Sequence, residues 1–480
     1  MSLHAGLRRW AGLVLLALIA NCAHAELPEA VSQALRQAGI PESHVGIVVQ
    51  EIGNPVPLLA HGENSAFNPA SLMKLVTTLV ALDSLGPAHT FKTRAYADGP
   101  IVEGVLRGNL ILQGGGDPAL TLERFWQLLR ELRERGVREI RGDVLLDGRF
   151  YQFDPIDPGA FDQSPLRPYN APPSALLVNF NTLNLRLSAA DGTLSARLDP
   201  QPLNAMPVLS GLVQISNAPC NGWREKVVQK IEGNQIVLSG SYSSACGEQS
   251  MPLNFLSPEA TLAAAFGAIW KELGGVHGGQ VLPVMSGTEV AVNAPLQLLL
   301  EFDSPPLAQL VRDINKFSNN VMAKMLFLNL GAARFEAPAT WDKAECAVRS
   351  WFKEHGLESP ELVLENGSGL SRIERISAAS LASLLRYAAA SPAYYEFAAS
   401  LPAVGLEGTQ KGRMPEAVTL GSAWLKSGTL NGARNLAGYT LGRNGARRIL
   451  VMLINHANAS AGAQAQEALT AWAMQHPASP

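Results

Sequence analysis

Three short groups of residues have the types and spacing needed for nucleophilic catalysis. They are Ser71-Leu72-Met73-Lys74, Ser318-Asn319-Asn320 and Lys426-Ser427-Gly428. A serine and a lysine three positions apart on a helix lie on one face, within reach of a hydrogen bond. The Ser71 hydroxyl is a poor nucleophile until a base takes its proton, and Lys74 can be that base only when it is neutral. Burial beside a second cation, for which Lys426 is the candidate, would favour the neutral amine.

Each group by itself is a weak signal. The Ser-x-x-Lys pattern also occurs at Ser350 and Lys353, whereas Ser-x-Asn and Lys-Ser-Gly each occur once. Ser350 comes after Ser318 in the chain, and no tight turn before it leads into an apolar helix. We therefore interpret the second copy as part of a solvated helix face and Ser71 as the nucleophile.

The segments around Ser71 predict how it is positioned. Apolar residues alternate over 45–49 and recur near Leu58, with Gly53-Asn54-Pro55 between them, which is typical of a β-hairpin. An apolar run with helical periodicity then covers 72–85. Ser71 is thus expected at the N-terminal end of a buried helix, where backbone N–H groups could help to stabilise an oxyanion.

The last third of the chain has helical patterns followed by strand patterns. The expected helices cover 306–327, 341–355, 378–390 and 463–474, and strands are expected to begin at Lys426 and to cover 436–441 and 448–455. Because a hairpin precedes these helices and strands follow them, we predict one sheet built from both chain ends.

The middle of the chain, residues 91–292, has a different pattern of apolar residues, glycine and proline. Short β-like runs separated by glycine and proline fill it, with helical patterns over 122–135 and 262–273. A chain of 480 residues is too long for a single core. We therefore expect 26–90 and 293–480 to form one α/β (α+β) domain, with 91–292 as a β-rich insertion of one or two domains.

The first 25 residues have the features of a cleaved signal peptide. Two arginines precede an apolar stretch over 11–20, and Ala23-His24-Ala25 is a small-x-small cleavage site. The stretch is too short to cross a membrane, and no later segment is long and apolar enough. A lipoprotein that begins at Cys22 is the alternative, disfavoured by the polar Asn21 before it. We predict export to the periplasm.

Export to an oxidising compartment would allow the cysteines to form disulfides. Cys220 and Cys246 lie 26 positions apart in a stretch rich in Gly, Ser and Asn, which favours a local disulfide in an oxidising compartment. The alternative is that the cysteines of the mature chain are all free thiols. Cys346 lies between Ala344 and Ala347 in a helical pattern, and we expect it to be a buried free thiol.

Charge and motif content argue against several other functions. The net charge is −3 and the lysines are scattered, so no basic face for nucleic acid is indicated. The run Gly114-Gly115-Gly116 lacks the Lys-Ser/Thr of a phosphate-binding loop, and no His-Glu-x-x-His occurs. No histidine accompanies a serine in a nucleophile-elbow pattern. We expect neither a metal site nor a nucleic-acid partner.

In their order along the chain, the three groups resemble the motif set of penicillin-binding proteins and serine β-lactamases. Ser318 follows Ser71 by 247 positions. Such a long insertion is similar to that of the class C low-molecular-mass penicillin-binding proteins, a D-alanyl-D-alanine carboxypeptidase/endopeptidase family. Further stretches resemble this family, namely Gly115-Gly116-Asp117-Pro118, Gly142-Asp143-Val144, Tyr169-Asn170-Ala171-Pro172-Pro173, Gly367-Ser368-Gly369-Leu370-Ser371-Arg372 and Asn435-Leu436-Ala437-Gly438-Tyr439.

Two positions depart from that family, because Ser427 stands where it usually has Thr and Asn366 where it often has Asp. The resemblance implies a serine β-lactamase/DD-peptidase-like transpeptidase fold around the insertion. It also implies that Ser71 attacks the carbonyl between two D-alanines, with Lys74 as the base.

The resemblance gives the remaining site residues these roles. Ser318 would relay the proton to the leaving amine, and Asn320 would hold the substrate amide. Lys426 would contribute its positive charge to the electrostatics of the site. Ser427 and Thr429 would bind the terminal carboxylate, and the backbone N–H groups of Ser71 and Thr429 would form the oxyanion hole. Two residues have no motif role: Arg372 is expected to line the site, and Asp162 is a candidate to contact a free amine of the substrate. Gly428 would let the substrate backbone approach closely.

The implied function is cleavage of peptidoglycan stem and cross-link peptides through an acyl-enzyme, without a cofactor, and acylation by β-lactam antibiotics. Two alternatives stay open. A serine β-lactamase is disfavoured by the long insertion, and a wall-binding scaffold with little turnover is disfavoured by the three intact motifs. The sequence carries no signal for an oligomeric state.

Overall fold

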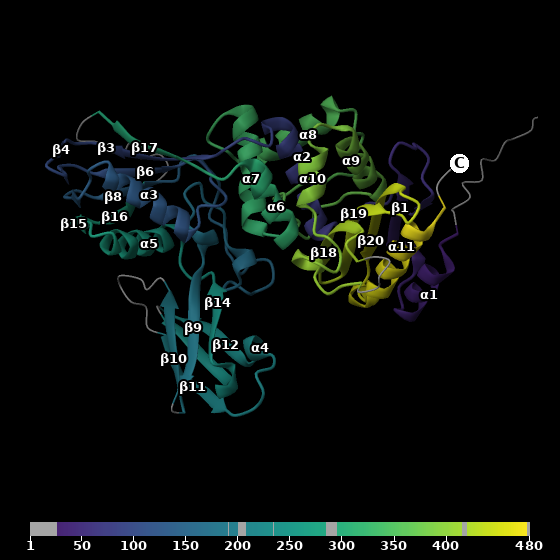
Figure 1. Ribbon diagram of the computed structural model, residues 1–480, viewed down its shortest axis with the longest axis horizontal. Coiled ribbons are helices and arrows are strands. Elements are labelled where there is room, and N and C mark those ends of the chain that lie inside the picture. The colour runs from purple at the N-terminus through teal and green to yellow at the C-terminus, as the bar shows by residue number, and fades with distance from the viewer. Residues whose placement is uncertain are drawn as a thin grey trace, which may run out of the picture.

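The computed structural model describes residues 26–190, 192–199, 208–233, 235–284, 295–414 and 420–477. The expected signal peptide and Cys22 lie outside the described residues. Across the described ranges, none of the helices is both long and apolar enough to span a membrane. Figure 1 shows a unit of sheet and helices that contains both ends of the described chain, and two smaller units formed by the middle of the chain.

The central sheet is built from both chain ends. Its strand order is β18-β19-β20-β1-β2, and every neighbouring pair is antiparallel. β1 pairs along its whole length with β20, which confirms the expected joining of the two ends. The strands are β1 (Val45–Glu51), β2 (Leu59–His61), β18 (Ala423–Leu430), β19 (Ala433–Leu441) and β20 (Arg447–Asn455).

Helices cover both faces of this sheet. Successive side chains of a strand point to opposite faces, so neighbouring residues of β1 belong to two different cores. Val45, Ile47 and Val49 of β1 share a core with α1 (Glu29–Gln37) and α11 (Ala463–Gln475). Val48 belongs instead to the core of the larger helical layer. That layer consists of α2 (Met73–Leu85), α6 (Leu307–Phe317), α7 (Asn320–Phe335), α8 (Trp341–Glu354), α9 (Ala378–Ala390) and α10 (Tyr394–Ser400).

The expected helix over 306–327 is in fact two helices, so that prediction is wrong. Ser318 has left-handed backbone angles (φ 59°, ψ 37°) and ends α6. Asn319 then caps α7, because its Oδ1 accepts a 3.1 Å hydrogen bond from the Met322 N–H. The break contains neither glycine nor proline, so the apolar pattern runs across it without an obvious interruption. One helix therefore ends and the next begins within the second motif.

The first unit of the middle segment is a mixed sheet in the order β16-β8-β6-β3-β17, with α3 (Leu122–Glu134) and α5 (Pro258–Glu272) in its core. β17 pairs with β3, so the chain stays in this unit up to Asp303, past the expected boundary at 292. The strands are β3 (Lys92–Ala97), β6 (Leu110–Gly114), β8 (Val144–Asp147), β16 (Val281–Pro283) and β17 (Gln297–Asp303). A second sheet contains β4 (Ile101–Val102), β5 (Val105–Leu106), β7 (Glu139–Ile140) and β15 (Val276–His277).

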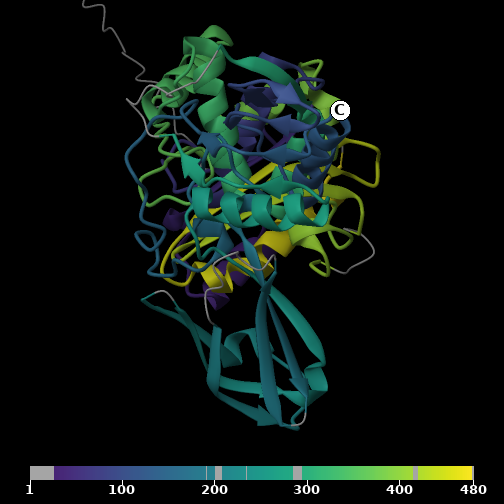
Figure 2. The same cartoon turned by 90° about the vertical axis from the view of Figure 1, so that its left-hand side faces the viewer.

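The second unit of the middle segment consists of two three-stranded sheets that enclose a hydrophobic core of their own. Figure 2 shows that this unit projects away from the rest of the molecule. One sheet contains β9 (Leu183–Ala190), β10 (Thr193–Asp199) and β14 (Glu248–Leu253), and the other contains β11 (Val208–Ser216), β12 (Val227–Glu232) and β13 (Gln235–Ser243). The expected disulfide between Cys220 and Cys246 is present, and it closes the segment that holds α4 (Trp223–Lys226), β12 and β13.

Cys346 is a free thiol on α8, but it is exposed, so the expectation that it is buried is wrong. The buried face of α8 includes Ala344, Val348 and Trp351, which recur at intervals of three and four. Two positions correspond to about 200° around a helix, so Cys346 projects away from Ala344. Its small neighbours in the sequence lie on a different face.

Candidate active site

The turn that presents Ser71 is fixed to the central sheet. The short 3-10 helix η2 (Ala70–Leu72) leads directly into α2. Asn68 Oδ1 accepts a 2.9 Å hydrogen bond from the Ala70 N–H, and the Asn68 N–H donates to Asn455 Oδ1 of β20 at 2.6 Å. Asn435 of β19 donates to the Asn68 carbonyl at 3.0 Å. Ser71 therefore has a defined position before α2, with a partly exposed side chain.

Lys74 is completely buried one turn after Ser71. Its Nζ lies 3.0 Å from Ser71 Oγ, 2.6 Å from Asn320 Oδ1 and 2.5 Å from the carbonyl oxygen of Ser368. The amine nitrogen therefore lies within hydrogen-bonding distance of the hydroxyl that it would deprotonate, and two oxygens on other segments hold it there.

The electrostatic environment favours a neutral Lys74. Burial holds the pKa of Lys74 well below its usual value, and the positive charges of Lys426 and Lys324 lower it further. The carboxyl group of Glu374 acts in the opposite direction. A neutral amine beside a hydroxyl can act as a general base toward it.

The break between α6 and α7 brings the second motif to the same place. Ser318 Oγ accepts a 2.9 Å hydrogen bond from Lys426 Nζ, and Asn320, the first residue of α7, contacts Lys74 through its Oδ1. The Asn320 amide nitrogen donates to the carbonyl of Tyr169 at 3.3 Å, in η3 (Pro168–Asn170) of the middle segment. Segments more than 200 positions apart therefore meet at this point.

The third motif occupies the second half of β18, which begins three residues before Lys426. Lys426 is completely buried, and burial lowers its pKa to about 7. A Cβ placed on Gly428 would lie 2.6 Å from the carbonyl oxygen of Pro69 and 3.0 Å from the Ser71 nitrogen. Glycine is needed at this position because the strand backbone passes directly against the Ser71 turn.

Ser427 and Thr429 are two positions apart on β18, so their side chains lie on the same face of the strand. Ser427 Oγ is 3.3 Å from Thr409 Oγ1 of η6 (Gly408–Gln410), and Thr429 is exposed. The two residues therefore place hydroxyl groups on one face of β18, directly after the buried Lys426.

The loop of residues 366–370 provides the third partner of Lys74. The Ser368 carbonyl accepts from Lys74, and the Gly367 carbonyl accepts a 2.7 Å hydrogen bond from Thr77 Oγ1 of α2. Gly369 has a φ of +80°, and a Cβ there would lie 1.8 Å from the Ala70 carbonyl oxygen, so the loop lies directly against η2. Sequence reasoning did not identify Ser368 as a site residue, because a backbone carbonyl has no side-chain signal.

Sequence reasoning also missed two buried charged residues next to the site, Lys324 and Glu374. Lys324 is 6% exposed and lies four positions after Asn320 on α7, and Glu374 is completely buried. A signal for Lys324 exists in the sequence, since it is a cation inside the otherwise apolar run of residues 321–328. Glu374 lies in a loop, where hydrophobic periodicity carries no information about burial.

Arg372 lies at the rim and contacts two segments. Its Nη1 donates to the carbonyl of Asn431 at 3.2 Å, just after β18, and its guanidinium lies 4.4 Å from the centre of the Phe161 ring. Asp162 accepts hydrogen bonds from the Tyr169 hydroxyl at 2.8 Å and from Asn170 Nδ2 at 2.7 Å. The structure therefore places both residues where the middle segment meets the site.

The second Ser-x-x-Lys copy lies elsewhere, on α8. Lys353 is exposed in the last turn of that helix, whereas Lys74 is completely buried. The second copy therefore lacks the buried setting that the first copy has.

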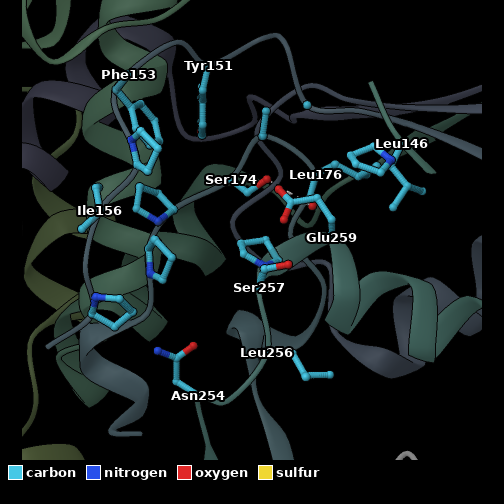
Figure 3. A pocket seen from close by; sticks show the side chains of 18 of the residues that line it. Leu146, Tyr151, Phe153, Ile156, Ser174, Leu176, Asn254, Leu256, Ser257 and Glu259 are labelled. Atoms are coloured by element: carbon cyan, nitrogen blue, oxygen red, sulfur yellow. Dashed lines mark hydrogen bonds between the residues drawn. The ribbon is translucent and has the colours of Figure 1, made fainter. Parts of the chain in front are cut away.

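A cavity of about 710 Å³ lies in the middle segment, between residues of its two units. Figure 3 shows its lining, in which Phe153, Ile156, Leu176 and several prolines surround a few polar groups such as Asn254 and Glu259. Among the described residues, those of the three motifs do not line it. The cavity is therefore separate from the cluster around Ser71.

Comparisons with known proteins agree with this geometry. Residues 27–476 match the D-Ala-D-Ala carboxypeptidase 3 (S13) family. The chain is 26% identical to the D-alanyl-D-alanine carboxypeptidase DacB of Haemophilus influenzae, over 87% of this chain and 86% of that protein. It is 28% identical to the D-alanyl-D-alanine carboxypeptidase of an Actinomadura species, over 88% and 79% of the two chains. The crystal structure of penicillin binding protein 4 from Haemophilus influenzae superposes with a TM-score of 0.75 at 24% identity, and it covers 92% of this chain and 98% of that chain.

Proposed function

Because this chain belongs to the D-Ala-D-Ala carboxypeptidase 3 (S13) family, we propose that it cleaves D-alanyl-D-alanine bonds of peptidoglycan through an acyl-enzyme on Ser71. It is a serine-type D-Ala-D-Ala carboxypeptidase, as the family and two relatives indicate. One observation supports the assignment of Ser71, namely the buried Lys74 nitrogen 3.0 Å from its hydroxyl. We propose that cross-link peptides are cleaved by the same site.

Acylation would proceed as follows. Neutral Lys74 takes the proton of the Ser71 hydroxyl while Oγ attacks the carbonyl carbon between the two D-alanines. The carbonyl oxygen gains negative charge, and the backbone N–H groups of Ser71 and Thr429 stabilise it. The carbon–nitrogen bond then breaks, the amine of the leaving D-alanine takes a proton by way of Ser318, and an ester on Ser71 remains. Water hydrolyses this ester and regenerates the hydroxyl.

The other motif residues would bind the substrate. Asn320 has an amide on the inner wall of the site and would orient the peptide bond that is cleaved. The terminal carboxylate of the substrate would lie against the hydroxyl groups of Ser427 and Thr429, near the charge of Lys426, and Gly428 leaves room for the peptide backbone. Arg372 would order the rim, where it joins β18 to the middle segment.

Penicillins are expected to acylate Ser71 by the same chemistry, since the β-lactam carbonyl takes the place of the peptide carbonyl. The test is labelling of the full chain with a fluorescent penicillin, beside Ser71→Ala and the matched decoy variant Ser350→Ala. We expect a stable label on the wild type and on Ser350→Ala, and none on Ser71→Ala. Label that is released rapidly would favour a β-lactamase, and a stable label without muropeptide hydrolysis would favour a scaffold. Retention of label by Ser71→Ala would refute the assigned nucleophile.

We further propose where the protein acts and how its chain is divided. Peptidoglycan lies outside the cytoplasmic membrane, which requires the export expected from residues 1–25, so the mature protein would begin at Glu26. The pairing of β17 with β3 supports an end of the insertion after Asp303. Mass spectrometry of the protein purified from the periplasm would identify its first residue, and Met1 in that fraction would refute cleavage.

A further inference from the structure

Glu374 is a completely buried carboxyl group that the mechanism above does not use. Its Oε1 accepts three backbone hydrogen bonds, from Glu365 at 3.2 Å, Asn366 at 3.0 Å and Gly367 at 3.0 Å. Its Oε2 is also buried and, within the described ranges, has no hydrogen-bond partner. Burial raises the pKa of Glu374, and the hydrogen bonds from the three backbone N–H groups act in the opposite direction because they stabilise the carboxylate.

The amides that Glu374 binds belong to the segment that holds Lys74. Gly367 donates its N–H to Glu374, and its carbonyl accepts from Thr77 on α2. The next carbonyl, that of Ser368, accepts from Lys74 Nζ at 2.5 Å. The segment is therefore held from both sides. Its N–H groups donate to Glu374, and its carbonyl groups accept from side chains of α2. Loss of the Glu374 acceptor would release three amides and shift the Ser368 carbonyl.

Three charged groups from different segments act on Lys74. Lys426 on β18 and Lys324 on α7 are positive, and Glu374 is the buried acid that acts on both Lys74 and Lys324. Glu365 also acts on Lys324 and Glu374, but its side chain is exposed and its charge is screened by water. Glu374 is therefore the acid that acts on Lys74, whereas Lys324 interacts with Glu365 first and with Glu374 second.

We propose that Glu374 is a positioning residue of the active site, whose carboxylate holds the 366–370 loop against Lys74 and supplies negative charge beside that buried amine. This inference rests on the proposed role of Lys74 as the base. It assigns to Glu374 two separable effects, one on geometry and one on charge. The geometric effect sets the maximal rate of acylation, and the charge sets the pH at which acylation begins.

The direction of the charge effect follows from elementary electrostatics. A neighbouring carboxylate stabilises the ammonium form of Lys74 and raises its pKa, as Glu374 does here. Removal of that charge therefore lowers the pKa of Lys74 and makes the neutral amine available at lower pH. Removal of a neighbouring cation has the opposite effect.

The test is the second-order rate constant for acylation of the full chain by a penicillin, measured from pH 5 to pH 9. Glu374→Gln keeps an oxygen for the three amides and removes the charge. The rising limb of the pH–rate profile, where the acylation rate increases with pH, is therefore expected at a pH lower by at least about 0.5 unit. Glu374→Asp keeps the charge but shortens the side chain, so it is expected to lower the plateau and leave the limb where the wild type has it. Glu365→Gln, which removes the exposed acid directly before that loop, is the matched control and should change neither the rising limb nor the plateau.

The outcomes separate this inference from the proposed function. If the Glu374→Gln limb coincides with that of the wild type, or Glu365→Gln shifts it equally, the charge role of Glu374 is wrong. If Glu374→Asp acylates with an unchanged plateau, the positioning role is wrong, and this result stands even where Glu374→Gln does not fold. Neither result affects the nucleophile or the base, which are tested by Ser71→Ala and Lys74→Arg.

Discussion

Three lysine side chains, Lys74, Lys324 and Lys426, are buried within one site. An ammonium group loses its hydration on burial, which favours the neutral amine. The pKa of Lys426 is about 7 and that of Lys324 about 8, and Lys74, which has two cations near it, is also held well below its usual value. Burial together with like charge thus favours the neutral form of Lys74, the proposed base.

Lys74→Arg tests the base directly. Arginine keeps the positive charge but cannot lose its proton at any pH at which the protein is folded. Acylation by penicillin should therefore fall by about 10²- to 10⁴-fold, the usual contribution of a general base. The rate constant is measured by stopped-flow quenching of protein fluorescence, with Lys353→Arg as the control at the exposed copy of the motif. A loss smaller than about tenfold in Lys74→Arg would show that another group is the base.

Lys426→Ala tests the charge that the third motif brings to Lys74. The lowered pKa of Lys74 means that acylation rises with pH as Lys74 loses its proton. Without the neighbouring cation the pKa of Lys74 rises, so the limb should move to higher pH and the rate at neutral pH should fall. Lys426→Met, which fills more of the space, should move the limb equally. A limb that stays in place in both variants would mean that burial alone lowers the pKa of Lys74.

At the scale of elements, the site depends on close approach of short segments. η2 is held by the sheet through Asn68, the α6–α7 break places Ser318 beside Lys426, and β18 passes against the Ser71 turn at Gly428. Each of these contacts joins segments that lie more than 100 positions apart in the sequence.

Gly428→Ala is expected to separate β18 from the Ser71 turn. The added methyl group would lie 2.6 Å from the Pro69 carbonyl oxygen, which is too close, so the strand must move. A displacement of about 1 Å at a reacting group can reduce a rate by about 100-fold, and we expect a loss of that size in acylation. The control is Gly211→Ala, where the added carbon has no neighbour within 4 Å. Equal acylation rates in the two variants would contradict the close approach.

At the scale of the whole molecule, the catalytic unit and the β9–β14 unit have separate cores. The central sheet packs between two helical layers, whereas β9–β14 enclose their own hydrophobic residues and carry the disulfide. The middle segment reaches the site at the Tyr169 carbonyl and at Phe161. Damage within the β9–β14 unit should therefore affect that unit far more than it affects the chemistry at Ser71.

Replacement of Cys220 and Cys246 by serine tests this separation. A disulfide that joins residues 26 positions apart is worth about 3 kcal/mol by loop-closure entropy. The variant should lose that much stability in the β9–β14 unit, seen as early cleavage there in pulse proteolysis, and should still acylate Ser71 at the wild-type rate at 25 °C. Alkylation of the exposed Cys346 serves as a control that leaves the disulfide intact. Loss of acylation together with unfolding of the unit would show that the two units are coupled.

Much of the fold and the set of motif residues could be predicted from the sequence, because these features depend on local spacing. Ser71 and Lys74 face each other through the geometry of one helical turn, and the hairpin and the C-terminal strands have apolar patterns that require a partner sheet. The order of the motifs and the length of the insertion indicated the family that the comparisons confirm.

What only the tertiary structure decided depends on contacts between distant segments. The left-handed Ser318 carries no glycine or proline signal, Cys346 is exposed although alanines flank it, and the Ser368 carbonyl reaches Lys74 across 294 positions of sequence. The burial of Lys324 and Glu374 follows from the same packing. A pKa depends on the water and charges that surround a group, and these are set by the packed neighbours rather than by adjacent residues. The sequence therefore predicts the candidate reacting groups, and the folded chain determines the environment of each one.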